Sequence, residues 1–536
     1  MRKGLSWVVL VTAVAFLGLA GPPSTRAADQ ALYGGTLVFG IGANPETLNP
    51  GLTTNVDALA VHCKMFNGLL YLDRDLNHRP ELAASWTVSR DGLVYRFTLQ
   101  KGVKWHDGKP FTSADVKFTF EEILGKYHPR TKIAFAQVGA VEAPDPHTVV
   151  VRFKKPYAPF LGQMTCQDGP ILPKHLYEGT DILKNPHNYD NPIGTGPFKW
   201  KEWVKGDHVT MVRNEDYFRK DMPYLDRAVA KIIPDSAARA LALDAGDVDY
   251  IQSFLLLKQE VARLSKNPAV QVKFDTDLPG IFIMFFNMRN KPLSDVRVRH
   301  ALATGLNRQQ MVEQAVYGLG RMAKSAIHVG LKWAYNPEVD YTKLFPYDSA
   351  KANALLDQAG LKRGSDGTRF TVRIAYDPTL PGLTPMAEIA RNNWQDLGIR
   401  VVMEPADRQV LVEKCFMKPD FDVTIWPYTT GGDPAIGISR AYASLPQPLP
   451  YTNPTGYSNP KVDELFNKAV ETPFRNERAK HYFEVQKIIA QDLPALALID
   501  RVEADVASIK FKGLWVSSQP YDEWDQVWWT GGKPKR

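Results

Sequence analysis

Hydrophobic and polar residues alternate along residues 93–99, so that Leu, Tyr, Phe and Leu fall on one face. This period of two is typical of a half-buried strand. Asp91-Gly92 and Asp107-Gly108 flank the segment, and these residue types tolerate the backbone of tight turns. Thr112 lies three residues before Asp115, which is the spacing of a capping box at a helix start. The pattern therefore predicts a hairpin, a second turn and a capped helix.

The pattern changes in the middle of the chain. From Tyr33 to about Phe286, strands and hairpin turns dominate, whereas from Ser294 to about Asp500 strands alternate with helices. A strand, helix and strand over residues 370–403 predict a βαβ unit, and hence a parallel sheet covered by helices. The other elements expected here are a helix capped by Asp348 and ended by Gly360, a strand at 421–425, and helices at 463–470 and 475–491.

The chain has 536 residues, more than the ~250–300 at which a single core stops growing, so two or three domains are expected. Proline is spread evenly and forms no linker, and no repeat period is present. We therefore expect a hinge of continuous chain near Thr276–Phe282, with a return crossing near Ala497–Val502.

The N-terminal segment has the features of a cleavable signal peptide. Arg2 and Lys3 precede an apolar stretch from Leu5 to Ala20, and Thr25-Arg26-Ala27 offers a cleavage site after Ala27. An uncleaved membrane anchor is disfavoured because the apolar core is shorter than the ~20 residues of a spanning helix. No cysteine follows the apolar stretch, so no lipid attachment is expected. A secreted protein without an anchor points to the periplasm of a Gram-negative cell.

Charge and cysteine content fit a secreted globular protein. The formal net charge of +7 includes three basic residues of the leader, which leaves about +4 on the mature chain. Both signs are scattered without a basic block, so a nucleic-acid surface is not expected. Cys63, Cys166 and Cys415 are too few for a disulfide framework. They allow one bridge or three buried thiols, and both alternatives stay open.

Catalytic signatures are missing from the sequence. It contains no G-x-S-x-G nucleophile elbow, no H-E-x-x-H zinc motif and no dinucleotide fingerprint after Gly40. The eleven histidines are dispersed, and His106 is expected to make a structural polar contact rather than bind a metal. We therefore expect a protein that is not an enzyme and holds neither a cofactor nor a metal.

The segment LAASWTVSRDGLVYRFTLQKGVKWHDGKPFTSADVKFTFEEIL, from Leu82 to Leu124, resembles the signature segment of extracytoplasmic solute-binding proteins of the peptide/nickel class. These proteins deliver solutes to ABC importers. Further stretches are similar to this family in the same order, and they span nearly the whole mature chain: 194–226, 237–249, 295–308 and 457–463.

This resemblance implies an α/β clamp of two lobes with mixed sheets, and a subdomain inserted into the first lobe. The expected parts are a signal peptide at 1–27, a first lobe from 28–75, 191–278 and 499–536, an inserted subdomain at 76–190, and a second lobe at 279–498. The implied function is capture of a peptide-like or oligosaccharide-like solute between the lobes. The implied partners are this solute and the membrane permease of an ABC importer with its ATPase subunits, and the protein is expected to be a monomer. The alternative is a metal-chelate or haem carrier, or a secreted hydrolase, on the same scaffold.

The best candidate for a binding wall follows the strand expected at 421–425. Ligands in α/β lobes sit beyond the C-terminal ends of strands, and in the resembled family this loop lines the cleft. Dipeptide binders of that family carry an Asp shortly after the aromatic residue, where it pairs with the ligand's α-ammonium. Here Thr and Gly occupy each matching position, which argues against ordinary dipeptide binding. The candidate residues of this wall are Trp426, Tyr428, Thr429, Thr430 and Asp433, with Asp433 the nearest acid.

The opposite wall of the cleft is expected in the loop after the first strand, and two residues of the second lobe are weaker candidates. Thr53, Thr54 and Asn55 form a run of short polar side chains in the loop after the first strand, and they suit hydrogen bonding to a ligand. Tyr376 and Arg408 lie at or just after the ends of expected strands in the second lobe. Core packing is the alternative for Trp426, whereas Tyr428 is expected to be exposed in the cleft.

Overall fold

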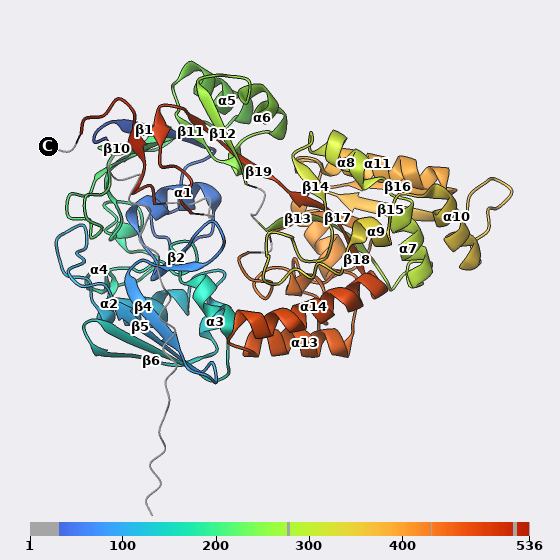
Figure 1. Ribbon diagram of the computed structural model, residues 1–536, viewed down its shortest axis with the longest axis horizontal. Coiled ribbons are helices and arrows are strands. Elements are labelled where there is room, and N and C mark those ends of the chain that lie inside the picture. The colour runs from blue at the N-terminus through green and yellow to red at the C-terminus, as the bar shows by residue number, and fades with distance from the viewer. Residues whose placement is uncertain (1–31, 276–278, 430, 518–522, 535–536) are drawn as a thin grey trace, which may run out of the picture.

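The computed structural model describes residues 32–275, 279–429, 431–517 and 523–534. It forms two lobes, each built around its own β-sheet (Figure 1). The predicted signal peptide at 1–27 lies outside the described residues, and so does Thr430.

The first lobe contains a seven-stranded mixed sheet. Its order is β12 (Val270–Asp275), β19 (Glu503–Ser508), β11 (Tyr250–Ile251), β1 (Thr36–Ile41), β10 (Arg227–Ile232), β9 (His208–Arg213) and β8 (Phe198–Val204). The helices α1 (Val56–Met65), α5 (Ser236–Ala245) and α6 (Lys258–Leu264) also belong to this lobe. Alternate residues of β1, such as Leu37 and Phe39, are buried in its apolar core. Near the C-terminus, β20 (Phe511–Lys512) pairs with β21 (Trp528–Trp529).

The inserted segment forms a four-stranded antiparallel sheet of its own. Its order is β4 (Ala83–Val88), β5 (Val94–Leu99), β7 (Thr148–Phe153) and β6 (Val138–Asp145). The predicted hairpin and capped helix are confirmed: Thr112 and Asp115 form a capping box before α2 (Ser113–Phe118), which continues as a π-helix, η2 (Thr119–Leu124). The other helices here are α3 (Lys132–Phe135), η3 (Ala158–Gln163), α4 (Lys174–Tyr177) and η4 (Pro186–Asn188).

The second lobe has a six-stranded mixed sheet. Its order is β14 (Gly320–Met322), β18 (Ala495–Arg501), β13 (Gly280–Phe286), β17 (Val423–Thr429), β15 (Phe370–Tyr376) and β16 (Ile399–Pro405). The predicted βαβ unit is confirmed, since β15 and β16 are parallel and α11 (Leu383–Asp396) joins them. The strand expected at 421–425 is displaced, because β17 begins at Val423 and runs to Thr429.

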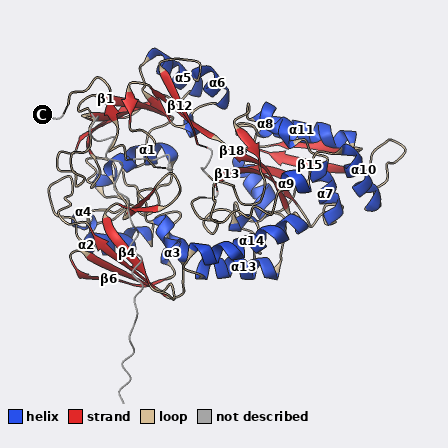
Figure 2. Cartoon of the chain, in the orientation of Figure 1, coloured by secondary structure: helices blue, strands red, loops and turns tan. Residues whose placement is uncertain are grey.

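Helices lie on both sides of this second sheet (Figure 2). Asp348 caps α10 as predicted, and Gly360 beyond its end has a positive φ of 81°. The helices of this lobe are α7 (Val296–Thr304), α8 (Arg308–Ala315), α9 (Tyr341–Leu344), α10 (Ser349–Gln358), α11, α12 (Arg408–Leu411), α13 (Pro460–Glu471) and α14 (Arg475–Asp492). They bury the apolar faces of both central strands, β13 and β18.

The chain passes between the two sheets twice. β12 belongs to the first sheet and β13 to the second, and β18 and β19 are separated by Val502 alone. A disulfide joins Cys63 of α1 to Cys166, which follows η3, so the helix of the first lobe is tied to the inserted segment. Cys415 is a free, buried thiol. The structure therefore selects one bridge from the two alternatives that the sequence left open.

Candidate functional site

Each central sheet turns one edge toward the other lobe. β13 begins at Gly280, just after the first crossing, and Gly280 pairs with Thr429 at the end of β17. β19 begins at Glu503, just after the second crossing, and β11 runs antiparallel to it while β1 runs parallel to β11. The C-terminal ends of β1 and β17 therefore lie on the edges that face each other. The loops after these two strands form the candidate site, which is the position that ligands take in α/β sheets.

The loop after β1 is organised by its own polar side chains. The Thr53 hydroxyl donates to Glu46 Oε2 at 2.9 Å, and the Asn55 amide donates to Glu46 Oε1 at 3.3 Å. Asn55 also caps α1 by accepting from the backbone N–H groups of Asp57 and Ala58. Thr53 is buried, while Thr54 is half-buried. These contacts fix the direction of the exposed Glu46 carboxylate, and ligand contact by Thr53, Thr54 and Asn55 stays a prediction.

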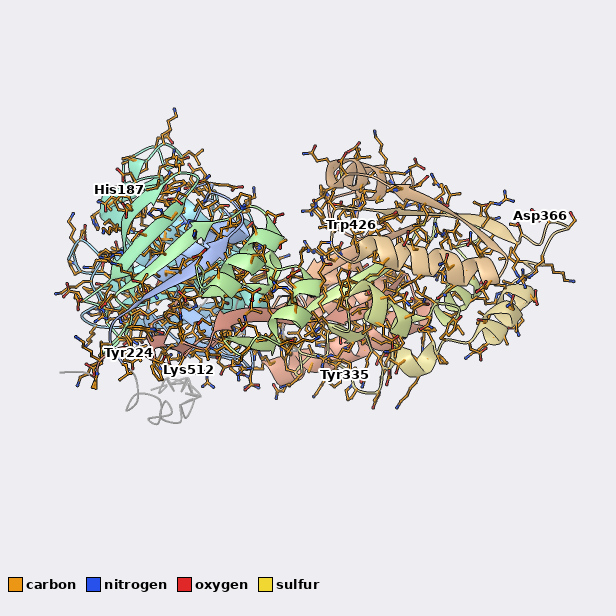
Figure 3. The ribbon with its side chains drawn as sticks, turned by 90° about the horizontal axis from the view of Figure 1, so that it is seen from above. His187, Tyr224, Tyr335, Asp366, Trp426 and Lys512 are labelled. Carbon is orange, nitrogen blue, oxygen red and sulfur yellow. A yellow bond between two sulfur atoms is a disulfide. The ribbon has the colours of Figure 1, made fainter. Side chains whose placement is uncertain are left out.

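The two aromatic residues of β17 lie in the core of the second lobe. Trp426 is 3% exposed, and its indole Nε1 donates to Thr424 Oγ1 at 2.9 Å. Tyr428 is 2% exposed, and its hydroxyl donates to the carbonyl of Tyr451 at 2.9 Å. Figure 3 shows Trp426 on the side of the second lobe that is turned toward the first. The expectation that Tyr428 is exposed is wrong, because Phe285 and Arg440 cover its ring.

Asp433 is engaged in a buried ion pair rather than left free for a ligand. Arg478 of α14 donates to both carboxylate oxygens, with Nη1–Oδ2 at 2.6 Å and Nη2–Oδ1 at 2.8 Å. Both side chains are less than a tenth exposed, at 9% for Asp433 and 3% for Arg478. A bidentate pair of this kind engages both carboxylate oxygens in charge-assisted hydrogen bonds, and Oδ1 also accepts from the backbone N–H of Ala435 at 3.0 Å. The structure therefore gives Asp433 a structural partner. Its role as a ligand anchor stays a prediction, and the ion pair with Arg478 argues against it.

The loop that contains Asp433 touches the first lobe. A Cβ added at Gly432 would lie 3.2 Å from Leu72, the last residue of β2 (Leu70–Leu72), which pairs with β3 (His78–Pro80). Leu72 and Leu76 pack into the apolar core of the second lobe, and Arg475 donates to the carbonyl of Leu76 at 2.8 Å. Desolvation lowers the pKa of the nearby His78 to about 3, so its imidazole is neutral at this contact.

The weaker candidates of the second lobe lie at the same edge, because β15 and β16 run parallel to β17. Tyr376, the last residue of β15, is 5% exposed, and burial raises the pKa of its hydroxyl. Arg408, at the start of α12, is more than half exposed and lies 3.5 Å from the buried carboxylate of Asp377. Of these two, Arg408 is the one whose side chain is open to a solute. Thr429 is also exposed, next to the undescribed Thr430.

Sequence reasoning did not single out Glu46, Arg440 or Tyr451. Arg440 lies in η7 (Ser439–Ala441), with its guanidinium 4.9 Å from the centre of the Tyr428 ring. Tyr451 is 37% exposed and contacts the rings of Phe416 and Trp426. The proline-rich stretch 446–454 was the available signal, since such loops hold one conformation at little entropic cost. Their proximity to β17 depends on contacts that no local pattern encodes.

Neither a membrane-spanning helix nor a cluster of metal-binding side chains occurs among the described residues. Within residues 32–275, 279–429, 431–517 and 523–534, no helix combines the length and apolar character that a membrane crossing requires. In the same ranges, no group of three or more His, Cys, Asp or Glu side chains is arranged to hold a metal ion.

Comparison with known proteins places this arrangement in a family. Residues 77–463 match the family described as bacterial extracellular solute-binding proteins, family 5, middle. The oligopeptide-binding protein AppA of Bacillus subtilis is 28% identical over 506 residues, which cover 91% of each chain. The heme-binding protein A of Haemophilus influenzae is 29% identical over 509 residues, covering 90% of this chain and 89% of that protein.

The likeness extends to the fold. The crystal structure of the ABC transporter substrate-binding protein CtaP from Listeria monocytogenes superimposes with a TM-score of 0.81. It is 24% identical and covers 93% of this chain and 100% of that one. The two-lobed architecture is therefore that of periplasmic binding proteins, and the relatives are binding proteins rather than enzymes. The match over residues 77–463 shows that this chain belongs to the family 5 extracellular solute-binding proteins, the peptide/nickel class of ABC importers.

Proposed function

We propose that this protein is the periplasmic component of an ABC importer that captures a peptide-like solute between its lobes and delivers it to the membrane permease. One observation carries the proposal: the loops after β1 and β17 leave the sheets at the two edges that face each other. A solute held by both loops contacts both lobes at once. Binding then favours the conformation in which the lobes are closed.

The chemistry of the two loops supports a polar, peptide-like solute. The first lobe contributes the Glu46 carboxylate, whose position Thr53 and Asn55 fix. The second lobe contributes the Arg408 and Arg440 guanidinium groups. A peptide offers N–H donors to a carboxylate and carbonyl or carboxylate oxygens to arginine. The name of the relative AppA, an oligopeptide-binding protein, agrees with this class of solute.

The location and the domain division belong to the same proposal. In this proposal, residues 1–27 direct export and are removed. The Cys63–Cys166 disulfide supports an extracytoplasmic location, because such bridges persist in oxidising compartments. The proposed division is a first lobe of 28–75, 191–278 and 499–536, an inserted subdomain of 76–190 and a second lobe of 279–498. The first crossing, between β12 and β13, agrees with the boundary at 278, whereas the second crossing lies at Val502, so residues 499–501 of β18 stay in the second sheet.

Mass spectrometry of the solute that co-purifies with the mature protein, released by denaturation, tests the proposal. The identified solute should rebind, return unchanged after incubation, and reduce the radius of gyration measured by small-angle X-ray scattering. A changed solute would instead indicate the hydrolase alternative, and unchanged scattering at saturation would contradict closure.

A matched pair of variants then tests the site. Glu46→Gln should weaken binding of the identified solute about tenfold, as expected when a hydrogen bond to a charged group is lost. The control Glu464→Gln changes an exposed carboxylate of α13 that pairs with Lys461 and Lys468, and it should bind normally. Equal binding by both variants would remove Glu46 from the site.

A further inference from the structure

Two exposed residues of the second lobe, Arg440 and Tyr451, contact the same buried tyrosine, one through its guanidinium and the other through its backbone carbonyl. The Tyr428 hydroxyl donates to the carbonyl of Tyr451 at 2.9 Å, and the guanidinium of Arg440 lies 4.9 Å from the centre of the Tyr428 ring. The backbone N–H of Asn453 also donates to the carbonyl of Arg440 at 2.7 Å. Because Tyr428 pairs with Ile281, one residue from Gly280, this group lies at the edge of the sheet that faces the first lobe.

Tyr451 is a partly exposed aromatic residue whose ring packs against two other aromatic rings. It is 37% exposed, and its ring centre lies 5.7 Å from that of Phe416 and 5.8 Å from that of Trp426. Its φ is +58°, in the left-handed region that a bulky side chain rarely adopts. Such strain persists only where surrounding contacts enforce it, and it concentrates at functional sites. The two rings and the hydrogen-bonded carbonyl hold Tyr451 in place while more than a third of the residue stays exposed.

Arg440 is an exposed cation, and no carboxylate among the described residues forms an ion pair with it. Its Nε donates to the carbonyl of Gly437 at 3.1 Å, and the face of Tyr428 supports the guanidinium plane. Other arginines of this edge already pair with carboxylates: Arg408 with Asp377, and Arg501 with Glu503. The terminal N–H groups of Arg440 are therefore suited to a carboxylate brought by a solute, since arginine binds carboxylates through paired hydrogen bonds.

We propose that Arg440 and Tyr451 form a subsite that recognises a carboxylate adjacent to a planar ring, as in the C-terminal aromatic residue of a peptide. Arg440 binds the carboxylate, and Tyr451 stacks on the ring. This inference rests on the proposed function and names the part of the solute that the second lobe selects. The buried Tyr428 positions the guanidinium of Arg440 and the backbone of Tyr451 without touching the solute.

Two tripeptides that differ at one group test this subsite: Ala-Ala-Phe with a free C-terminal carboxylate, and the same peptide as its C-terminal amide. Isothermal titration calorimetry on the mature protein should show the acid bound at least about tenfold more tightly, the scale of a hydrogen bond to a charged group. Arg440→Gln should abolish this preference. Tyr451→Asn, which tolerates the left-handed backbone, should weaken both peptides about tenfold through the lost ring face.

The matched control is Arg227→Gln, which changes an exposed arginine at the start of β10, at the end of the first sheet remote from the second lobe. This variant should keep both affinities. Equal affinity of the wild-type protein for acid and amide, or a preference that survives Arg440→Gln, would overturn the subsite. Failure of the wild-type protein to bind either tripeptide would also overturn it. The proposed function would still stand in that case if the co-purified solute rebinds unchanged, and it would fail separately if that solute is turned over.

Discussion

Replacing Asp433 by Asn removes one charge from a buried ion pair while keeping the size of the side chain. In the structure, Arg478 makes two charge-assisted hydrogen bonds to Asp433, at 2.6 and 2.8 Å. It also donates to the carbonyl of Ala469 at 2.6 Å and to the Tyr482 hydroxyl at 3.1 Å. Those two bonds survive the substitution. The cost therefore comes from a guanidinium that stays buried without its counter-charge.

The magnitude follows from this burial. Side-chain exposures of 9% and 3% leave little water to screen the remaining charge. Breaking a buried pair by removing one partner costs about 3–5 kcal/mol of unfolding free energy. Arg478→Met removes the other charge, so the double variant leaves no buried charge unpaired. Its cost should fall short of the sum of the single costs by about 2 kcal/mol or more, as expected for residues in contact.

Urea unfolding followed by tryptophan fluorescence measures these free energies for the wild-type protein, both single variants and the double variant. Asp366→Asn is the control: it changes an exposed acid that lies 3.4 Å from Arg400, and it should leave the unfolding curve unchanged because exposed ion pairs contribute little. The reasoning would be refuted if Asp433→Asn unfolded like the wild-type protein but no longer distinguished the co-purified solute from its N-acetylated form. Asp433 would then be a ligand anchor.

Three further predictions follow from the described contacts. Replacing Cys63 and Cys166 by Ala should lower the free energy of unfolding by about 4–5 kcal/mol, since the bridge closes a sequence separation of 103 residues. A reductant should lower the stability of the wild-type protein but not that of the double variant, and an equal effect on both proteins would contradict this. Trp426→Ala should cost about 3–5 kcal/mol of unfolding free energy in urea because the indole is buried, whereas weakened binding without destabilisation would place the indole in the site. Burial raises the pKa of Asp500 from 3.8 to about 7, so the folded state keeps a proton that the unfolded chain releases. Stability should therefore fall as pH rises from about 4 to 7, and Asp500→Asn should reduce that fall, with an unchanged pH profile counting against the mechanism.

Local patterns were sufficient for the elements of this protein. The capping box of Thr112 and Asp115 follows from contacts between residues close in sequence, and the parallel pairing of β15 with β16 follows from the strand–helix–strand order of one continuous segment. Burial of alternate residues in β5 follows from its period of two. These features depend on backbone geometry and on which face is apolar, and both can be derived from a short stretch of sequence.

The environment of the candidate residues could not be read in this way. Tyr428 was expected in the cleft because it follows a strand and precedes glycines, yet it is buried since Phe285 and Arg440 approach from other elements. Asp433 looked like a free acid because its partner, Arg478, lies 45 residues away on α14. Because the two residues are far apart in the sequence, no local pattern shows that the Arg478 guanidinium pairs with this carboxylate.

The sequence by itself determined the two kinds of secondary-structure pattern and the resemblance to solute-binding proteins, and it predicted an export signal and the loss of the dipeptide-type acid. Only the tertiary structure decided which cysteines pair, which lobe edges face each other, and that Tyr451 rather than Tyr428 presents an open ring. The physical reason is that periodicity and capping are short-range properties of the backbone. Burial, ion pairing and access to a solute depend instead on contacts between residues brought together by the two crossings of the chain.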